Sequence, residues 1–417
     1  MTRHFDALET RDPEQREQEL FARLPAFLRA ATARMPGLAG WLNGIDLDQV
    51  NTREALTALP VLRKSELMRM QTEHPPFGGF ADMSTLGGQR VFMSPGPIFE
   101  PELSHEQALN VARAFFAAGI RAGDLVHNAF SYHLTPGGFM IDAGARALGC
   151  TVFPAGTGNT ETQVEAAVML APSVYAGTPD FLKIMLDRAA DTGQDLSSIT
   201  RGVVSGGALF PSLREEYAAR GVSVMQCYAT AEFGVIAYES AAEDGSLVPG
   251  MVIGEHLIVE IVRPGTGNPV PDGEVGELVV TCFNAGYPVV RLGTGDLSAI
   301  MSEPSPCGRT GIRIKGWMGR ADQRTKVKGM FVDPKQVADV LARHPEIGRA
   351  RLVITRDQER DAMTLHVEPA DETMPETRAV ADTLREITKL GGEVVVAGKG
   401  TLPNDGKVIS DERDYDR

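Results

Sequence analysis

The sequence predicts an α/β protein: a large N-terminal domain with mainly parallel sheets flanked by helices, followed by a small α+β domain. Three observations lead to this fold class. A length of 417 residues suggests two or more domains. Between residues 125 and 227, short apolar runs alternate with segments of helical periodicity, which is typical of parallel sheets covered on both faces. After residue 256, short strands separated by turn signals replace that alternation.

The first hundred residues are expected to be mostly helical. Apolar residues recur there at helical spacing and form one face, namely Leu20, Phe21, Leu24, Phe27 and Leu28. The segment Ser104-His105-Glu106-Gln107 has the pattern of a capping box and opens a helix that runs to about Ala118.

Strands and helices then alternate along the chain. We expect strands at 126–130, 151–154, 173–175, 202–205 and 222–227. We expect helices after Gly137 and at 160–170, 179–190 and 211–220. This order predicts βα units and a parallel sheet.

The C-terminal part has a different texture. From His256 to Ile300, strands such as 257–262 are separated by turn signals and predict a small antiparallel sheet or barrel. Beyond Gly319 we expect a compact α+β unit with helices at 334–343 and 376–390 and strands near 352–354 and 364–367. The predicted domains are therefore residues 1–321 and 322–417.

Bulk properties exclude several classes of protein. The formal net charge is −14 and the pI is about 5.1, which argues against nonspecific binding to nucleic acid or anionic membranes, because both need a positive field. No apolar run is long enough to span a bilayer, and the N-terminus lacks a signal peptide's apolar core. The four cysteines are scattered without zinc-ligand spacing. We expect a cytoplasmic enzyme with small-molecule partners, and a homodimer stays open.

Five short segments in a fixed order carry the chemistry. They are Tyr228-Ala229-Thr230-Ala231-Glu232, Gly293-Thr294-Gly295-Asp296, Gly319-Arg320-Ala321-Asp322, Lys326-Val327-Lys328-Gly329 and Gly400-Thr401-Leu402-Pro403-Asn404-Asp405-Gly406-Lys407. Their order and spacing resemble the adenylate-forming enzymes, most closely the phenylacetate–CoA ligase family. The resemblance implies that ATP activates a carboxylic acid, aromatic or arylacetic, as an acyl-adenylate, and that coenzyme A accepts the acyl group.

The resemblance also implies roles for single residues. Lys407 would contact the reacting carboxylate, and Glu232 would hold Mg²⁺ on the nucleotide phosphates. Asp322 would be the hinge on which the C-terminal domain rotates. The residues expected to bind the nucleotide here are Tyr228, Thr230, Asp296 and Arg320. Taken alone, each segment has an ordinary alternative: a packed tyrosine, a surface glutamate, a hairpin turn at Asp296 or a linker arginine.

Two further segments resemble those that frame the acyl and adenine pocket in this family. In Ser205-Gly206-Gly207-Ala208 the small residues would let a flat ring approach the main chain, with Ser205 and Gly206 facing the acid and Gly207 and Ala208 the nucleotide. In the segment Ser131–Gly138, Tyr132 and His133 would flank the acid. The alternatives are a plain strand-to-helix turn, a core aromatic and a satisfied histidine.

The phosphate loop departs from the family. Its place is taken by Ser94-Pro95-Gly96-Pro97-Ile98-Phe99-Glu100-Pro101, in which Ser94 and Gly96 match the expected nucleotide-binding positions. Two prolines remove N–H donors, and Glu100 stands where the family has a lysine. A carboxylate there should oppose ATP more than AMP. This departure supports an alternative function, a ligand-binding or acyl-transferring relative with lost or weakened adenylation.

Overall fold

The protein is described from a computed structural model that covers residues 3–207, 209–321, 323, 325–327, 330–357 and 360–413. The chain forms two compact units. The first comprises Met1–Val259, Val280–Leu292 and Met301–Trp317, and the second comprises Glu260–Val279, Gly293–Ile300 and Met318–Arg417. No helix in the described ranges is long and apolar enough to cross a membrane.

The N-terminal helices form as expected. They are α1 (Pro13–Thr32), α2 (Pro36–Trp41), α3 (Arg53–Leu56) and α4 (Lys64–Glu73), with short 3₁₀ turns at Ala7–Thr10, Leu47–Gln49 and Met83–Thr85. The Asp12 side chain accepts a hydrogen bond from the backbone N–H of Gln15 and caps α1, and Pro13 occupies its first turn. Leu24 and Leu28 on the predicted apolar face are completely buried.

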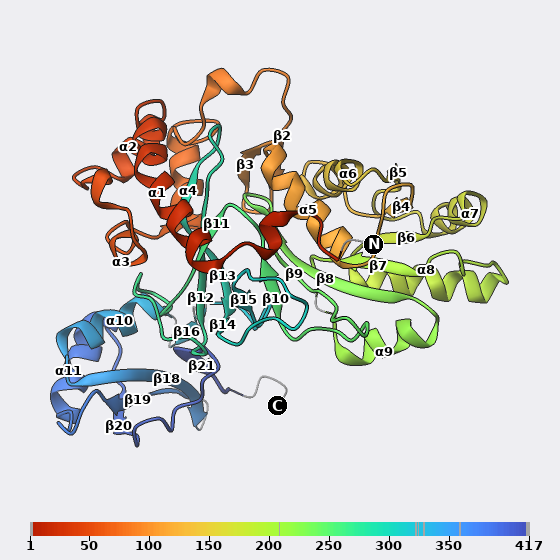
Figure 1. The fold of residues 1–417 in the computed structure, drawn as a ribbon. Helices are drawn as coiled ribbons and strands as arrows, with labels where there is room; N and C mark the ends of the chain where they lie inside the picture. The colour runs from red at the N-terminus through yellow and green to blue at the C-terminus, as the bar shows by residue number, and fades with distance from the viewer. Residues whose placement is uncertain are drawn as a thin grey trace. The chain divides into compact units, whose positions relative to one another are not determined.

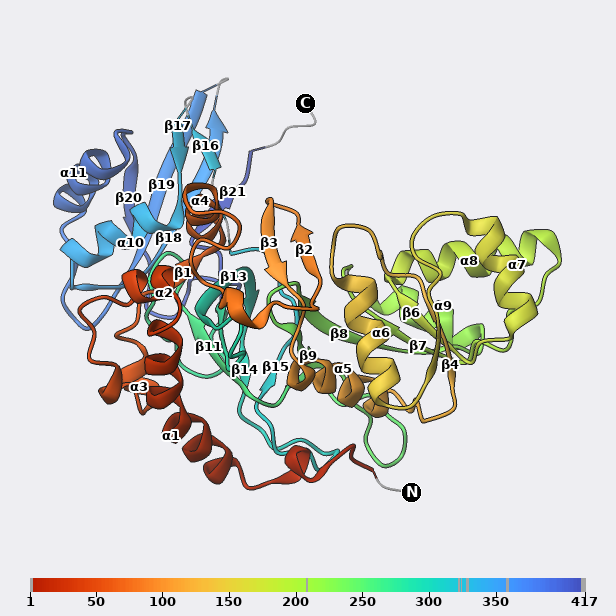
Figure 2. The ribbon, with the colours of Figure 1, turned by 90° about the horizontal axis from the view of Figure 1, so that it is seen from above.

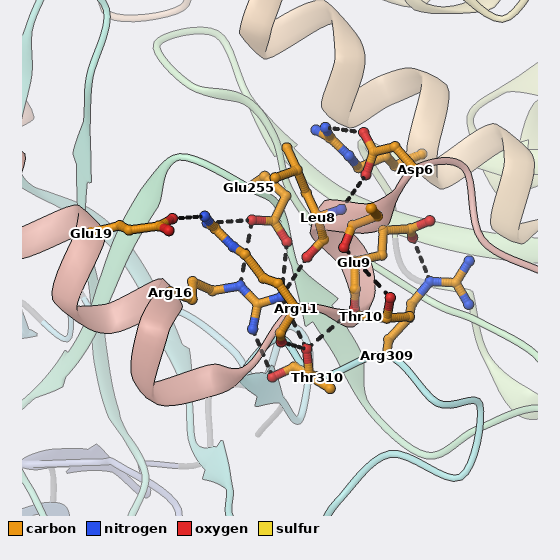
Figure 3. Close-up of polar contacts among 12 residues, drawn as sticks. Asp6, Leu8, Glu9, Thr10, Arg11, Arg16, Glu19, Glu255, Arg309 and Thr310 are labelled. Carbon is orange, nitrogen blue, oxygen red and sulfur yellow. Dashed lines mark hydrogen bonds and ion pairs between the residues drawn. The ribbon is translucent and has the colours of Figure 1, made fainter.

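Residues before α1 and in its first turn are bound to the rest of the first unit by buried charges (Figure 3). Arg309 Nε and the hydroxyl of Tyr238 both donate to the carboxylate of Glu9, whose side chain is 1% exposed. Arg16 donates to Glu255, whose side chain is 5% exposed. Because these charges are paired in the interior, they fix where the N-terminal segment lies.

The main sheet of the first unit confirms the predicted βα alternation. Strands β4 (Leu125–Asn128), β5 (Thr151–Phe153), β6 (Val174–Gly177), β7 (Arg201–Val204) and β8 (Ser223–Thr230) pair in parallel, in the order β8-β7-β6-β4-β5. The sheet continues as β14-β15-β10-β9-β8, through β9 (Gly234–Tyr238), β10 (Met251–Ile253), β15 (Arg313–Ile314) and β14 (Ile300–Met301). The pairings of β8 with β9 and of β9 with β10 are antiparallel.

Helices cover both faces of the parallel strands (Figure 1). They are α5 (His105–Ala117), α6 (Gly137–Ala147), α7 (Thr160–Leu170), α8 (Pro179–Thr192) and α9 (Pro211–Ala219). In β6, Val174 and Ala176 join the core formed with α5 and α6, whereas Tyr175 joins the core formed with α7, α8 and α9. Successive residues of a strand point to opposite faces, so a continuous apolar run was the correct signal for a sheet buried on both sides.

Two smaller sheets carry predicted motifs. Strands β2 (Val91–Ser94) and β3 (Ile98–Pro101) form a hairpin that contains the altered phosphate loop. Strands β1 (Leu62–Arg63), β11 (Leu257–Val262), β12 (Gly276–Cys282) and β13 (Val289–Ser298) have the order β1-β13-β12-β11. The alternative of a hairpin turn at Gly293–Asp296 is wrong, because this segment continues β13, with Gly295 at φ +75°.

The C-terminal part of the second unit is the expected α+β unit. Strands β18 (Ile347–Asp357), β19 (Arg360–Pro369), β20 (Glu393–Val396) and β21 (Ile409–Asp411) form a sheet in the order β20-β19-β18-β21. Helices α10 (Pro334–Arg343) and α11 (Thr377–Thr388) lie beside it (Figure 2) and share its core. Strands β16 (Thr325–Val327) and β17 (Met330–Val332) precede it. A boundary at residue 322 stays a prediction.

Candidate active site

Glu232 lies in the turn between β8 and β9 and is paired with a lysine from another part of the first unit. Lys64, the first residue of α4, places its Nζ 2.7 Å from Glu232 Oε1. The Glu232 side chain is 0% exposed and that of Lys64 is 36% exposed. Both carboxylate oxygens of Glu232 are buried without a hydrogen-bond partner among the described residues, so the contact is an ion pair without hydrogen-bond geometry. Glu232 is therefore not the surface glutamate of the ordinary alternative.

The hairpin β2–β3 holds Ser94 and Glu100 together. Ser94 Oγ donates a 2.6 Å hydrogen bond to Glu100 Oε1, and the Glu100 residue is 1% exposed. Burial raises the pKa of Glu100 to about 8, the Ser94 hydrogen bond opposes that rise, Glu232 adds to it and Lys64 opposes it. This carboxyl is therefore buried and hydrogen-bonded to the Ser94 hydroxyl. That its charge opposes ATP more than AMP stays a prediction.

The residues of the first unit that we expected to bind the nucleotide lie around the ends of β7 and β8. We expected Tyr228 and Thr230 after a strand that ends at residue 227, but β8 continues through Thr230 because it pairs antiparallel with β9 beyond that point. Gly206 adopts φ +71°, and the carbonyl of Gly207 accepts a hydrogen bond from the Gln226 side chain at 3.0 Å. This bond ties the glycine segment to β8.

Ser205 and Gly96 occupy fixed positions in the same unit. Ser205, directly after β7, is 6% exposed, and its N–H donates to the Gly177 carbonyl at 3.2 Å. Gly96 lies in the turn of the β2–β3 hairpin, where an added Cβ would come within 2.9 Å of the Ile98 side chain. Gly96 therefore has little room for a side chain, and the hydrogen bond of Ser205 fixes its backbone.

Tyr132 and His133 precede α6. Asn128 Nδ2 donates to the Tyr132 hydroxyl at 2.7 Å, and the Tyr132 ring lies edge-on to Phe139 with 5.1 Å between the centroids. An added Cβ on Gly138 would lie 2.7 Å from the Tyr132 ring, which explains the small residue there. The pKa of Tyr132 is raised, mainly by burial, so its hydroxyl stays neutral. His133 is exposed and is not the satisfied core histidine of the alternative.

In the second unit, Asp296 and Arg320 form one pair. Arg320 Nη1 donates to Asp296 Oδ1 at 2.8 Å, and the two side chains are 56% and 14% exposed respectively. The guanidinium group lies over Gly295, where an added Cβ would come within 2.6 Å of it. Arg320 is thus not a free linker residue. The structure brings together Asp296 and Arg320, two residues that we expected to bind near the ribose.

One glutamine binds the backbone on both sides of Lys407. The Gln323 side chain donates to the Gly406 carbonyl at 2.8 Å and accepts hydrogen bonds from the N–H groups of Val408 and Ile409. Lys407 itself is exposed and shares a groove with Arg263 and Arg349. Gln323 thereby fixes the backbone on both sides of the lysine.

Several predicted positions fall outside the described residues, namely Ala208, Asp322, Lys328 and Gly329, together with the side chain of Lys326. Lys64 and Gln323 were missed by the sequence reasoning. Lys64 had a signal: together with Arg63 it places two cations at the start of α4, where the helix dipole favours anions. Such a placement indicates a partner elsewhere, and Glu232 is that partner.

Comparisons with known proteins place these motifs in a family. The family model for AMP-binding enzymes matches residues 102–282. A phenylacetate–coenzyme A ligase from Thermus thermophilus is 32% identical over 341 residues, which are 79% of this chain and 75% of that protein. One from Aromatoleum evansii is 30% identical over 340 residues, or 78% and 74% of the two chains. The chain belongs to the phenylacetate–CoA ligase family.

Solved structures agree with the fold of this phenylacetate–CoA ligase family member. The structure of 2-hydroxyisobutyryl-CoA ligase with its acyl-AMP and CoA is similar, with a TM-score of 0.71, 24% identity, and coverage of 99% of this chain and 93% of that one. The open conformation of the same ligase gives a TM-score of 0.73 at 23% identity. These likenesses confirm the predicted fold class across nearly the whole chain.

Proposed function

We propose that this chain is an ATP-dependent acid–CoA ligase that works through an acyl-adenylate. Membership of the phenylacetate–CoA ligase family is the observation that carries this function, because relatives at 30–32% identity span about four fifths of the chain. In the first step a carboxylate oxygen of the acid attacks the α-phosphorus of ATP and pyrophosphate leaves. In the second, the sulfur of coenzyme A attacks the acyl carbon and AMP leaves.

Lys407 is the proposed catalytic cation of the first step. Its ammonium group would offset the negative charge that develops as the carboxylate attacks phosphorus, and preorganised charge of this kind lowers the barrier. Asp296 would accept hydrogen bonds from the ribose hydroxyls and Arg320 would bind the ribose or a phosphate. Asp322 would be the hinge between domains 1–321 and 322–417, so that Lys407 serves the first step and withdraws for the second.

Mg²⁺ is the proposed metal, and the first unit fits it. Glu232 is buried with two oxygens that lack hydrogen-bond partners in the described part of the chain, and hard oxygen ligands are those that Mg²⁺ prefers. No group of three or more His, Cys, Asp or Glu side chains in the described ranges forms a metal cage. That matches a cation bound by one or two carboxylates and by substrate phosphates. Mg²⁺ would screen the phosphate charges during adenylation.

The acid is proposed to be aromatic or arylacetic. Tyr132 presents a neutral, half-buried ring beside Phe139, and the small residues Ser205 and Gly206 leave room for a flat ring near the main chain. Tyr228, Thr230, Ser94, Gly96, Gly207 and Ala208 are proposed to bind the nucleotide. The four cysteines are all free, which fits a reducing cytoplasm, and a homodimer remains a proposal without a described interface.

A second function is favoured by one observation. Glu100 occupies the position of the phosphate-loop lysine and engages the hydroxyl of Ser94, so two groups of the loop face each other instead of a phosphate. A relative that binds the acid or transfers an acyl group with weakened adenylation would tolerate this change.

Two measurements separate the functions. Purified protein is incubated with ATP, Mg²⁺ and a panel of aryl, arylacetic and short aliphatic acids, with and without CoA. Pyrophosphate release and acyl-CoA mass are followed. A ligase gives CoA-dependent acyl-CoA with one class of acid, and hydroxylamine traps its adenylate in the absence of CoA. Failure to release pyrophosphate with every acid, while acids still raise the melting temperature, would establish the weakened relative.

A further inference from the structure

Several buried polar groups of the first unit lack hydrogen-bond partners in the described part of the chain, and three of them affect one another electrostatically. These three are Glu100 Oε2, both carboxylate oxygens of Glu232 and the hydroxyl of Tyr287. Each residue is 1–2% exposed, and a buried polar group without a partner costs about 1–3 kcal/mol. Protein interiors rarely retain several such groups unless a water, an ion or a ligand satisfies them.

These groups share one neighbourhood. Glu232 and Lys64 both act electrostatically on Glu100. The pKa of Tyr287 is raised by burial first and then by the charges of Glu100 and Glu232. Helix α4, which begins at Lys64, also packs against β3, where Gln71 exchanges two 2.8 Å hydrogen bonds with the backbone of Phe99, next to Glu100.

The charges in this neighbourhood do not suit a triphosphate. When both are ionised, the carboxylates of Glu100 and Glu232 outweigh the single ammonium group of Lys64, and the sum is negative. Prolines 95 and 97 offer no N–H donors, and the Ser94 hydroxyl donates to Glu100. A phosphate group bound here therefore needs a positive charge that the loop does not supply. Carboxylates are ligands of divalent cations, and Mg²⁺ is bound by one or two carboxylates together with substrate phosphates.

We propose that Glu100 and Glu232 together form a divalent-cation site, and that this chain binds the β- and γ-phosphates of ATP through that cation where its relatives use a loop lysine. Glu100 binds the cation directly or through a water. The inference rests on the proposed function for the identity of the nucleotide, but cation binding itself requires no turnover.

The test titrates Mn²⁺, a spectroscopic substitute for Mg²⁺, followed by electron paramagnetic resonance. Each titration is run with a non-hydrolysable ATP analogue and with AMP. The variants are Glu100→Gln, which has the same shape and still accepts the Ser94 hydrogen bond, and Glu100→Asp, which keeps the charge. Glu102→Gln is the matched control, because Glu102 lies two residues away and pairs with Arg90 at the protein surface.

Wild type is expected to bind Mn²⁺ more tightly with the ATP analogue than with AMP. Glu100→Gln should weaken Mn²⁺ binding at least about tenfold with the analogue, Glu100→Asp should weaken it less, and Glu102→Gln should match wild type. In Glu100→Lys the new ammonium group should take over the role of the cation. In EDTA, this variant should therefore bind the ATP analogue more tightly than wild type does.

Two results would overturn the proposal. One is a Mn²⁺ affinity in Glu100→Gln that equals that of wild type. If Glu100→Gln does not fold, unchanged Mn²⁺ affinity in both Glu100→Asp and Glu100→Lys would count in the same way. The other is equal Mn²⁺ affinity of wild type with the ATP analogue and with AMP. If wild type forms acyl-CoA and Glu100→Gln keeps the Mn²⁺ affinity of wild type, this inference alone is refuted. Absent acyl-CoA formation with a Glu100-dependent Mn²⁺ site would instead refute the ligase function alone.

Discussion

Replacing Lys64 with alanine should destabilise the metal-free protein through the charge it leaves behind. Glu232 is 0% exposed and its ion-pair partner Lys64 is 36% exposed. Removing one partner of a fully buried pair costs about 3–5 kcal/mol, whereas an exposed pair contributes about 0–1 kcal/mol. Because only one side of this pair is buried, we expect the free energy of unfolding to fall by about 2 kcal/mol. The measurement is urea denaturation of the full chain in EDTA, following the transition of the first unit.

Lys183→Ala is the matched control for this experiment. Lys183 is 40% exposed, close to Lys64, but its partners Asp187 and Glu216 are 41% and 32% exposed. Its loss should therefore stay under about 1 kcal/mol. Mg²⁺ binding to the uncompensated Glu232 should raise the free energy of unfolding of Lys64→Ala more than that of the control or of wild type. Equal stability of the two lysine variants, or no selective recovery in Mg²⁺, would refute the reasoning.

Four further changes test other parts of the molecule. Lys407→Ala should slow adenylate formation about 100- to 1000-fold and leave thioester formation from preformed adenylate intact; equal losses in both half-reactions would contradict its role. Asp296→Ala should weaken ATP and AMP alike by roughly 1.5–3 kcal/mol in calorimetry, and unchanged AMP affinity would leave Asp296 a purely structural residue. Gln323→Ala should also slow adenylation selectively, by about tenfold, and a wild-type adenylation rate would show that its three hydrogen bonds do not position the lysine. Glu9→Ala should lower the free energy of unfolding by about 3–5 kcal/mol, because it leaves Arg309 unpaired in the interior; a urea transition shifted by less than 1 kcal/mol would mean that water reaches the arginine.

Local patterns predicted most elements of the fold. The helix at Thr160–Leu170, the strand Leu257–Val262 and the helix Pro334–Arg343 have the bounds that periodicity and capping gave them, since these signals lie within the segment itself. The misplaced end of β8 has a different origin. Its last residues pair with β9 across a register shift between Tyr228 and Ala229, and strand pairing of this kind depends on a partner that the local pattern does not contain.

The site was predicted less completely, because its ion pairs join distant segments. Resemblance identified Glu232, but only the fold brings Lys64 to it. The burial of Glu100 had a local signal that we did not use. In β3, Ile98 and Glu100 are both buried while Phe99 between them is half-buried, and alternate residues of a strand share a face. This alternation alone predicts that a carboxyl group two residues from a core isoleucine points inward.

This inward carboxyl decides between the two functions. A buried glutamate that kept its proton would leave the loop without a positive charge and with few donors for phosphate, since prolines replace two N–H donors and Ser94 already donates to Glu100. The relative with weakened adenylation would then be the correct description. If Glu100 instead binds a divalent cation beside Glu232, the loop can bind phosphate through that cation. The rate of adenylation would then depend on the cation concentration more steeply than in a relative with a loop lysine. The Mg²⁺ dependence of pyrophosphate release, compared between wild type and Glu100→Lys, separates these cases, because only the second gives a variant that needs less metal.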